Sequence, residues 1–391
     1  MKNDNQNLEE LLDRGAEEVI DRKNLEDKLK SGKKLRLKLG IDPTSPNLHL
    51  GRSIPLLKLR DFQKLGHTVV FIIGDFTGVI GDTSDKDSER PMLEEEQVRE
   101  NLKSYKQQAG KIIDLEKAEI HYNSEWLGKL NYMEIGKQAN FFSLNEFISR
   151  ENISKRLKGG KRISLREILY PLMQGYDSVM IKADVEVGGT DQRFNLLTGR
   201  TMQRHYKQEP QDIITNPLIE GLDGEKMSSS KGNTINLTDS PNDMFGKIMS
   251  MQDNLVIKYF ILLTRVSMVK VKEYEKEMKE GSNPRDFKLK LASEVVRMYH
   301  SEKEADEAEK YFVETFSQKK TPDKMPEFKA ENRDIVSVLS ESGLTSSKGE
   351  ARRVLSQKGV KVDGEVVEDA DYIIKKGSVL QKGKIKFLKI L

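Results

Sequence analysis

The sequence predicts an α/β protein built on a doubly wound parallel sheet and followed by smaller domains. The first observation is a strand, a helix and a second strand within residues 35–73, because two parallel strands joined by a helix are the unit of such sheets. The second is the run 69–73, which is apolar and β-branched like a parallel strand covered on both faces. The third is the length of 391 residues, which exceeds one ordinary core and predicts two or three domains.

Composition excludes several classes of protein. Apolar residues make up 36% of the chain and charged residues 33%, which is typical of a soluble folded protein. There is no cysteine, which excludes disulfides, thiolate metal sites and cysteine nucleophiles and fits a cytoplasmic location. The five histidines never fall at metal-binding spacing, so no protein-held metal is expected. No apolar run is long enough to span a membrane, and the amino terminus lacks a signal-peptide pattern.

Periodicity predicts the elements of the first half of the chain. Residues 8–30 are expected to form one amphipathic helix, and the alternating run 35–41 a strand with one polar face. A helix should then extend to about Leu65, where Gly66 stops it. A further helix is expected over residues 94–113, with apolar side chains in register.

A second α/β stretch is predicted to begin near Ser164. A Ser-x-x-Glu capping box there opens a helix that is expected to end at about Asp177. Strands should follow within residues 179–187, and two short strands at 213–214 and 218–219.

The remainder of the chain changes character twice. Residues 240–316 read as helical, with one break at 281–284. Residues 317–332, with two prolines and several lysines, are the expected linker. The last sixty residues predict a helix rich in arginine and lysine, and then short strands separated by glycines.

The segment 46–52, Pro-Asn-Leu-His-Leu-Gly-Arg, is a candidate phosphate site. It follows a strand and opens a helix, whose amino terminus attracts anions through unpaired N–H groups and the helix dipole. His49 and Thr44 can donate hydrogen bonds to phosphate oxygens, Gly51 permits close approach, and Arg52 adds a forked cation. Taken alone, the same pattern also fits a strand-to-helix turn whose histidine caps the helix.

The segment 226–232, Lys-Met-Ser-Ser-Ser-Lys-Gly, is a second candidate. Two lysines around three serines make a cationic loop rich in donors, suited to a phosphate on which charge develops during a reaction. Alone, it could equally be a solvated surface loop. Together, the two segments predict a nucleoside triphosphate bound from two sides.

Tyr170, Gln174 and Asp177 are spaced four and three apart, which places them on one face of a helix. A phenol, an amide and a carboxylate aligned in this way favour recognition of a small polar ligand, although a solvent-facing stripe is the alternative. The turn 188–192, Gly-Gly-Thr-Asp-Gln, offers further acceptors and an amide. The polar loop 81–90 either folds over a phosphate or is a surface loop.

These motifs, in the order HxGx, YxxxQxxD, GGTDQ and KMSSS, resemble class I aminoacyl-tRNA synthetases. The match is specifically to the tyrosyl-tRNA synthetase family, in its longer bacterial type with a carboxyl-terminal S4-like RNA-binding domain, and it runs from Leu35 to the end. The resemblance implies a Rossmann-like catalytic domain with a dimerisation insertion, a helical anticodon-recognition domain, a linker and an S4-like α+β domain. Their expected limits are 1–240 with the insertion at about 110–150, 241–316, 317–332 and 333–391.

The resemblance also implies an activity. Such an enzyme is a tyrosine–tRNA ligase, which activates L-tyrosine with ATP to tyrosyl-adenylate and transfers it to the 3′ end of tRNA(Tyr). Mg²⁺ is expected to arrive with ATP rather than in a protein cage, and a cytoplasmic homodimer without membrane contact is implied. Tryptophanyl specificity and a non-enzymatic RNA-binding relative remain alternatives, and the intact motif set argues against the second.

Residue roles follow from the same resemblance. The residues expected in catalysis are Thr44, His49, Lys86, Arg90, Lys226 and Ser229. Those expected to bind ATP are Gly40, Asp42, His49, Gly51, Arg52, Asp191, Lys226, Met227, Ser228, Ser229 and Ser230. Those expected to bind tyrosine are Lys38, Asp82, Tyr170, Gln174, Asp177 and Gln192. Those expected to bind RNA are Lys348, Arg352 and Arg353.

The resemblance makes Asp177 the acceptor for the substrate phenol and Asp191 the ligand of the ribose. Three positions depart from the common pattern of the family. Arg52 stands where a second histidine is usual, Ser229 where many members have lysine, and Lys38 where many have tyrosine.

Overall fold

The structure is a computed structural model in which the chain divides into two compact units. The first consists of Met1–Ser240 and Lys247–His300, and the second of Pro241–Gly246 and Ser301–Leu391. The residues that the structure describes are 2–84, 92–317, 325–330, 333–383 and 386–391.

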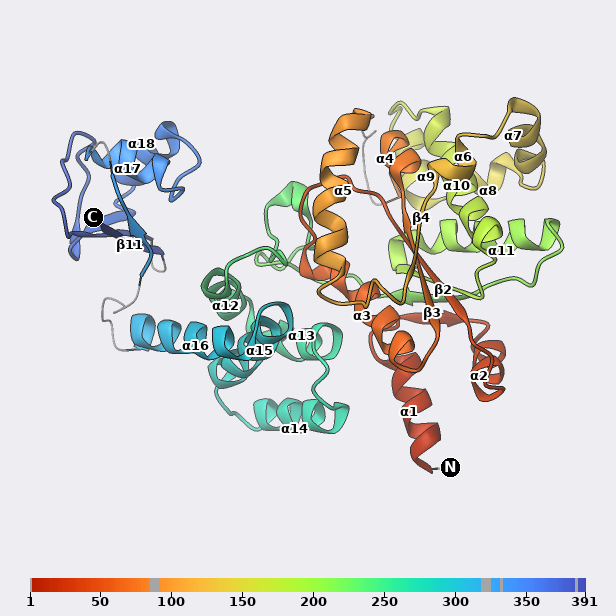
Figure 1. Cartoon of the computed structure of the whole chain (residues 1–391), viewed down its shortest axis with the longest axis horizontal. Helices are drawn as coiled ribbons and strands as arrows, with labels where there is room; N and C mark the ends of the chain where they lie inside the picture. Colours follow the sequence, from red (N-terminus) through yellow and green to blue (C-terminus); the bar gives the residue numbers. More distant parts are fainter. Residues whose placement is uncertain (1, 85–91, 318–324, 331–332, 384–385) are drawn as a thin grey trace. The chain divides into compact units, whose positions relative to one another are not determined.

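The first unit combines one mixed sheet with many helices (Figure 1). Its strands are β1 (Glu18–Ile20), β2 (Arg36–Ile41), β3 (Thr68–Ile73), β4 (Glu119–Tyr122), β5 (Val185–Gly189) and β6 (Asp212–Asn216). Its helices are α1 (Lys2–Asp13), α2 (Arg22–Lys30), α3 (Leu50–Lys64), α4 (Asp75–Ile80), α5 (Glu95–Ala109), α6 (Ser124–Leu127), α7 (Tyr132–Ala139), α8 (Leu144–Ile148), α9 (Glu151–Lys158), α10 (Leu165–Ile181), α11 (Arg193–His205), α13 (Val256–Leu263), α14 (Met268–Lys279) and α15 (Pro284–Tyr299). Single 3₁₀ turns are η1 (Thr190–Gln192), η2 (Ser229–Lys231) and η3 (Asp253–Leu255).

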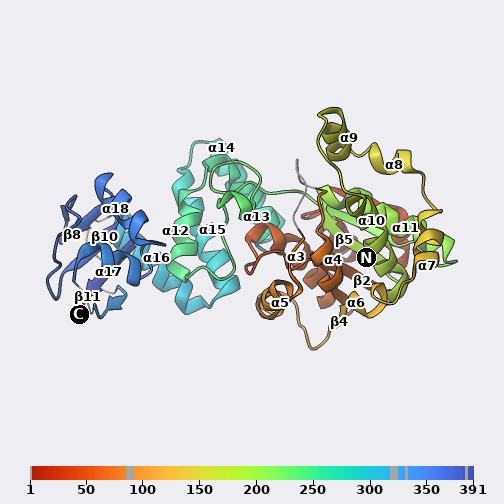
Figure 2. The same cartoon turned by 90° about the horizontal axis from the view of Figure 1, so that it is seen from above.

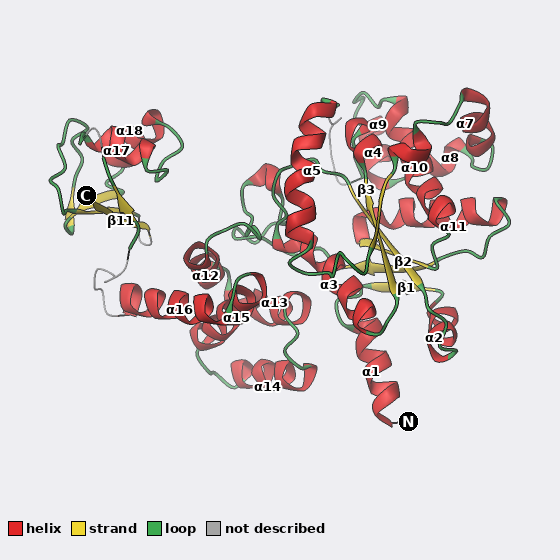
Figure 3. Cartoon of the chain, viewed as in Figure 1, coloured by secondary structure: helices red, strands yellow, loops and turns green. Residues whose placement is uncertain are grey.

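The sheet is doubly wound, as the sequence predicts. Its strand order is β1-β6-β5-β2-β3-β4, and every neighbouring pair is parallel except β1 with β6. The chain winds outward from β2 through β3 to β4 and then returns to place β5 on the other side of β2. Helices lie on both sides of the sheet (Figure 3). The order of the strands therefore reverses between β2 and β5, and ligands bind in the crevice outside the carboxyl ends of strands at such a point.

The strands owe their positions to their side-chain patterns. In β3, the apolar residues 69–73 are all buried, as expected for a strand covered on both faces. In β2, the alternation puts Leu37 and Leu39 on one face and Lys38 on the other. Lys38 lies on the predicted polar face and is fully buried, because α10 packs against it.

Two predicted elements differ from those observed, one near the amino terminus and one just before β5. Residues 8–30 are not one helix: α1 ends at Asp13, Gly15 is left-handed between α1 and the short strand β1, and Asp21 is left-handed between β1 and α2. Residues 179–181 are helical rather than extended, because α10 continues past Asp177 until Lys182 adopts a left-handed conformation.

Two further points of comparison with the predicted elements concern residues 110–150 and residues 218–219. The segment 110–150, expected as an insertion, contributes β4 to the edge of the sheet. Residues 218–219 are not a strand; they lead instead into a narrow hairpin closed by a bridge between Glu220 and Lys226.

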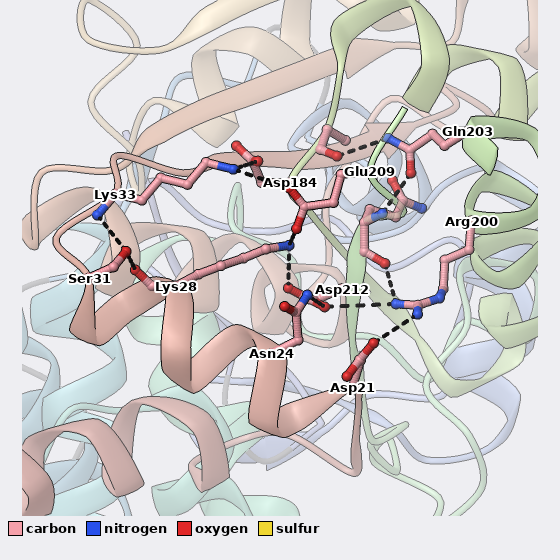
Figure 4. Close-up of polar contacts among 12 residues, drawn as sticks. Asp21, Asn24, Lys28, Ser31, Lys33, Asp184, Arg200, Gln203, Glu209 and Asp212 are labelled. Carbon is pink, nitrogen blue, oxygen red and sulfur yellow. Dashed lines mark hydrogen bonds and ion pairs between the residues drawn. The ribbon is translucent and has the colours of Figure 1, made fainter. Parts of the chain in front are cut away.

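The amino ends of β5 and β6 are held by a polar cluster (Figure 4). Asp212 is buried at the start of β6 and lies between Lys28 of α2, at 3.0 Å, and Arg200 of α11, at 3.8 Å. Lys33 binds Asp184 just before β5 at 2.7 Å. Because these contacts join side chains of α2 and α11 to Asp212 of β6, we interpret the cluster as attaching the two helices to the sheet.

The predicted helical segment 241–316 is divided between the units. The helix α12 (Pro241–Ser250) crosses the boundary, and α13 to α15 belong to the first unit. The reason is that α13 packs on α3, and Arg265 pairs with Asp61 at 2.7 Å. The predicted break is present between α14 and α15.

The second unit carries α16 (Glu302–Ser317) and a small α+β fold. Its sheet has the order β7-β11-β10-β8-β9, and its apolar core is formed by side chains of two helices and these strands. The remaining elements are α17 (Ile335–Glu341), α18 (Lys348–Ser356), β7 (Glu327–Phe328), β8 (Val360–Val362), β9 (Glu365–Val366), β10 (Val379–Lys382) and β11 (Lys386–Ile390). Part of the expected linker is therefore a strand, because β7 pairs with β11.

One buried ion pair gives a test of the fold beside the sheet. Arg156 of α9 and Glu167 of α10 have side chains only 1% and 0% exposed and lie 2.5 Å apart. We expect Arg156→Met to lower the free energy of unfolding by about 3–5 kcal/mol, because it leaves a buried carboxylate without a cation. Urea unfolding followed by the fluorescence of Trp126, the single tryptophan, measures this.

The matched control is Arg156→Met combined with Glu167→Gln, which removes both charges. It should recover most of the lost stability, since a neutral pair no longer carries the desolvation cost of an uncompensated charge. Equal losses in the single and double variants would contradict this account.

Candidate active site

One cavity of about 610 Å³ opens at the carboxyl ends of β2 and β5. Its lining comes from segments that are far apart in the sequence and that the switch in strand order brings together. The predicted site residues that line it are Gly40, Asp42, Thr44, His49, Gly51, Arg52, Asp82, Tyr170, Gln174, Asp177, Asp191, Gln192, Lys226, Met227, Ser228, Ser229 and Ser230. Lys38 is not among the lining residues, and Lys86 and Arg90 lie outside the described residues.

His49 sits at the amino terminus of α3 and makes no side-chain cap there. Burial, and then the positive charges of Arg52 and Lys226, lower the pKa of His49 to about 3. The imidazole is therefore neutral at physiological pH and has a single N–H to donate. Its Nδ1 is buried and has no hydrogen-bond partner among the described residues.

Gly51 explains how the two phosphate segments can touch. A Cβ atom at this position would lie 3.0 Å from His49 Nδ1 and 3.2 Å from a methyl of Ile219. The backbone N–H of Gly51 also points at the sulfur of Met227, 3.4 Å away. The absence of a side chain therefore lets α3 approach the second segment closely.

Arg52 is anchored rather than loose in the cavity. Its Nη1 donates to the hydroxyl of Tyr105 on α5 at 2.6 Å, and its Nη2 donates to Thr44 Oγ1 at 3.3 Å. Because Thr44 Oγ1 accepts from Arg52, its own proton is left to point elsewhere. Tyr105 was not among the residues predicted for the site.

The segment 226–232 forms the far wall of the cavity. Lys226 Nζ lies 3.1 Å from Asp191 Oδ2, across the cavity from α3. Asn233 stiffens the loop, since its Oδ1 accepts from Ser228 N at 2.9 Å and its Nδ2 donates to Asp223 at 2.7 Å. Ser229 is exposed, and the second lysine of the loop pairs with a glutamate outside the cavity.

The base of this loop is attached to α13. Lys258 binds the carboxylate of Glu220 at 2.8 Å, and the Tyr259 hydroxyl donates to the backbone oxygen of Glu220 at 2.6 Å.

Asp177 is a buried carboxylate in the lining of the cavity. Its Oδ1 accepts from Trp126 Nε1 at 2.7 Å and its Oδ2 from Asn123 Nδ2 at 3.3 Å. Burial raises the pKa of Asp177 to about 7, although the charge of Lys38 and the two hydrogen bonds oppose the rise. Each oxygen retains a lone pair, so the carboxylate can still accept a hydrogen bond from a ligand.

Four further polar side chains line the cavity, in two hydrogen-bonded pairs. The hydroxyl of Tyr170 donates to Asp42 Oδ2 at 2.7 Å, and burial beside this carboxylate raises the pKa of Tyr170 well above its ordinary value. Gln192 Nε2 donates to Asp82 Oδ2 at 2.7 Å. The result is an acidic compartment next to a cationic one.

Lys38 is held outside the lining by a buried partner. Its Nζ lies 2.8 Å from Glu186 Oε1, and the two side chains are 0% and 1% exposed. Sequence reasoning missed Glu186, although a glutamate between valines in a buried strand was a usable signal. It also missed Trp126 and Asn123, whose positions carry no periodic pattern.

The predicted RNA-binding residues lie together in the second unit. Lys348, Arg352 and Arg353 are on α18, and all three are exposed. Among the described residues, no group of three or more His, Asp or Glu side chains is placed to hold a metal ion. No described helix is long and apolar enough to cross a membrane.

Comparison with known proteins gives two family matches. Residues 30–317 match the family model of class I tRNA synthetases (W and Y), and residues 335–380 match the S4 domain. The tyrosine–tRNA ligase of Thermotoga maritima is 47% identical over 97% of this chain and 96% of its own length. That of Mannheimia succiniciproducens is 47% identical over 97% of each chain.

Solved structures agree with this fold. A mitochondrial tyrosyl-tRNA synthetase of Coccidioides posadasii superposes with a TM-score of 0.64 at 26% identity, covering 78% of this chain and 91% of that one. The Archaeoglobus fulgidus tyrosyl-tRNA synthetase, solved with L-tyrosine, has a TM-score of 0.63 at 23% identity and covers 78% and 99%. With both domains matched and close relatives spanning nearly its whole length, the chain belongs to the tyrosine–tRNA ligase family of class I tRNA synthetases.

Proposed function

We propose that the cavity binds L-tyrosine and ATP side by side and joins them as tyrosyl-adenylate, which then esterifies tRNA(Tyr). The observation that carries this proposal is the division of one cavity into an acidic end, around Asp177 and Asp82, and a donor-rich end, around His49 and Lys226. An amino acid with an ammonium and a phenol fits the first end, and a triphosphate fits the second.

The chemistry needs no protein nucleophile. A carboxylate oxygen of tyrosine attacks the α-phosphorus of ATP, the bond to the β-phosphate oxygen breaks, and pyrophosphate leaves. A ribose hydroxyl at the 3′ end of tRNA(Tyr) then attacks the activated carbonyl, and AMP leaves. The protein contributes alignment of the two substrates and stabilisation of charge on the phosphate oxygens.

Specific residues take specific roles in this proposal. His49 and Thr44 donate to the phosphates, and Arg52 acts through Thr44, to which it is already bonded. Asp191 binds the ribose, and Lys226, which pairs with Asp191 in the structure, is then able to follow the phosphates. Lys86, Arg90 and Ser229 are proposed to assist pyrophosphate departure, with Gly40, Asp42, Gly51, Met227, Ser228 and Ser230 also contacting ATP.

The tyrosine end is assigned in the same way. Asp177 accepts the hydrogen bond of the substrate phenol, and Asp82, Tyr170 and Gln174 surround its ammonium, with Gln192 beside them. Mg²⁺ is proposed to arrive bound to ATP, where its charge neutralises the phosphates.

Partners outside the cavity are also proposed. Lys348, Arg352 and Arg353 offer exposed positive charge for an RNA backbone, and the S4 match supports this use. Large apolar side chains are exposed on α7 and α8: Tyr132 is 95% exposed, Met133 70% and Leu144 63%. Such a surface supports a homodimer formed through residues 110–150. We further propose a cytoplasmic location and the expected domain limits of 1–240, 241–316 and 333–391.

The proposal is tested by amino-acid-dependent exchange of pyrophosphate into ATP. We expect exchange with tyrosine and none measurable with tryptophan. Phenylalanine should be rejected by about 10⁵-fold, a value known for this enzyme family rather than derived from this structure. Exchange with tryptophan would favour the sister specificity, and no exchange with any amino acid would favour a non-enzymatic RNA-binding protein.

Replacement of the phenol acceptor should remove selectivity. We expect Asp177→Asn to lower kcat/KM for tyrosine by about 10²–10³-fold and to leave kcat/KM for phenylalanine nearly unchanged, because only tyrosine loses a hydrogen bond. The KM for ATP should not move. An equal loss for both amino acids would contradict the assignment.

The same residue predicts a pH dependence. The pKa of Asp177 is raised to about 7, so the carboxylate becomes a full acceptor only as the pH rises through that value. We expect kcat/KM for tyrosine to rise between about pH 6 and 8 and this step to be absent in Asp177→Asn. The pH profile of pyrophosphate exchange in the two proteins is the measurement.

Close packing at Gly51 predicts a catalytic defect. In Gly51→Ala the added methyl would meet the His49 ring at 3.0 Å, so the imidazole must shift. We expect kcat for tyrosine activation to fall by about tenfold with KM for tyrosine unchanged, since the phosphate donor is displaced. Gly349→Ala is the matched control, because a Cβ there meets only Ser347 Oγ at 3.7 Å and the residue does not line the cavity.

A further inference from the structure

A buried ion pair lies directly behind the tyrosine end of the cavity. Lys38 of β2 and Glu186 of β5 are opposite each other in the register of the two parallel strands. Their side chains are 0% and 1% exposed, and the distance from Lys38 Nζ to Glu186 Oε1 is 2.8 Å. Burying two charges costs as much as their attraction returns, so such a pair is weak evidence for stability and invites another explanation.

Apart from their bond to each other, Lys38 and Glu186 are hydrogen-bonded mainly to the helix that carries the proposed tyrosine ligands. Besides Glu186, Lys38 Nζ donates to the backbone oxygen of Gln174 and to Ser178 Oγ, each at 2.8 Å. Its three protons are therefore all engaged. Glu186 Oε2 accepts from Ser178 Oγ at 3.1 Å and from Gln211 Nε2.

The remaining contact of Glu186 is with the side chain of Gln174. Gln174 Nε2 donates to Glu186 Oε1 at 3.2 Å, and Gln174 Oε1 accepts from Asn195 Nδ2 at 3.0 Å. An ionised carboxylate can only accept hydrogen bonds, so it admits the NH₂ group of the amide and excludes its oxygen. The charge on Glu186 thus decides which way round the amide of Gln174 sits.

We infer that the Lys38–Glu186 pair orients the amide of Gln174 so that its oxygen is presented to the cavity as an acceptor for the ammonium of tyrosine. This inference rests on the proposed role of Gln174 in tyrosine binding. Lys38 and Glu186 are positioning residues, because they reach the substrate only through Gln174.

Lys38 is needed for Glu186 to hold the amide of Gln174 in this orientation. A carboxyl group that is buried without a cation favours its neutral form, which carries an O–H donor. That donor could bond the amide oxygen of Gln174 and turn its NH₂ group toward the substrate ammonium, where two donors would oppose each other. Lys38 supplies the required positive charge, with its Nζ atom 2.8 Å from Glu186 Oε1.

The test compares two fragments of tyrosine, one that lacks the carboxylate and one that lacks the ammonium group. Tyramine keeps the ammonium and the phenol, whereas 3-(4-hydroxyphenyl)propanoate keeps the phenol and lacks the ammonium. Their inhibition constants against tyrosine are measured by pyrophosphate exchange with the full-length chain. The variant is Lys38→Met combined with Glu186→Gln, which removes both charges at similar volume and leaves Gln174 without a preferred orientation.

We expect the double variant to weaken tyramine by about ten- to hundredfold, the loss of a charge-assisted hydrogen bond, and to change 3-(4-hydroxyphenyl)propanoate by less than twofold. Lys38→Met alone should show the same selectivity. Equal weakening of both ligands would mean that the pair merely supports the shape of the cavity, and no change in either would mean that Gln174 is oriented without it. Either result overturns the inference.

Gln174→Ala separates this inference from the function on which it rests. If Gln174→Ala weakens tyramine selectively and the pair variants do not, the inference fails and the role of Gln174 stands. If Gln174→Ala shows no selective loss, the proposed role of Gln174 fails, and the inference falls with it.

Discussion

The pairing of β2 with β5 is the constraint on which the site depends. These strands come from segments about 150 residues apart and are held in register with Leu37 opposite Val185 and Lys38 opposite Glu186. Because both strands run in the same direction, the turn after Ile41 and the turn after Gly189 emerge at one edge. Without this pairing, the first phosphate segment and the Gly-Gly-Thr-Asp-Gln turn would have no reason to share a cavity.

The pairing of β2 with β5 also explains why acidic and basic side chains occupy different parts of the cavity. The carboxylates of Asp42, Asp82 and Asp177 lie toward the sheet and α10, whereas Arg52 and Lys226 lie at the mouth between α3 and the serine loop. An amino acid carries its ammonium beside its carboxylate, so a substrate gripped by the acidic end directs its carboxylate at the phosphates. Alignment for the reaction is in this way a consequence of charge placement.

Much of this arrangement could be predicted from the sequence, because it follows from local periodicity. Helical spacing alone places Tyr170, Gln174 and Asp177 on one face, and all three line the cavity. The donors to Asp177 could not be predicted in this way. Asn123 and Trp126 come from a separate segment, and only the parallel pairing of β4 with β3 brings them there.

Errors of prediction have equally local causes. The single helix expected over residues 8–30 fails at Gly15 and Asp21, where the backbone becomes left-handed and the chain is drawn into pairing with β6. The polar face of β2 could be predicted but the burial of Lys38 could not, because a charge can be buried wherever a partner of opposite sign is buried with it. Periodicity reports which residues share a face, but it does not report what covers that face.

The first phosphate segment combines a neutral histidine, His49, with a fixed positive charge on Arg52. A neutral His49 can donate a hydrogen bond to a phosphate without adding charge, and its burial keeps it neutral, with the charges of Arg52 and Lys226 adding to this effect. Arg52 is one of these cations, and its guanidinium is held by the hydroxyls of Tyr105 and Thr44. In the proposed complex with ATP, Arg52 therefore supplies charge and orients Thr44, while His49 and Thr44 donate the hydrogen bonds to the phosphates.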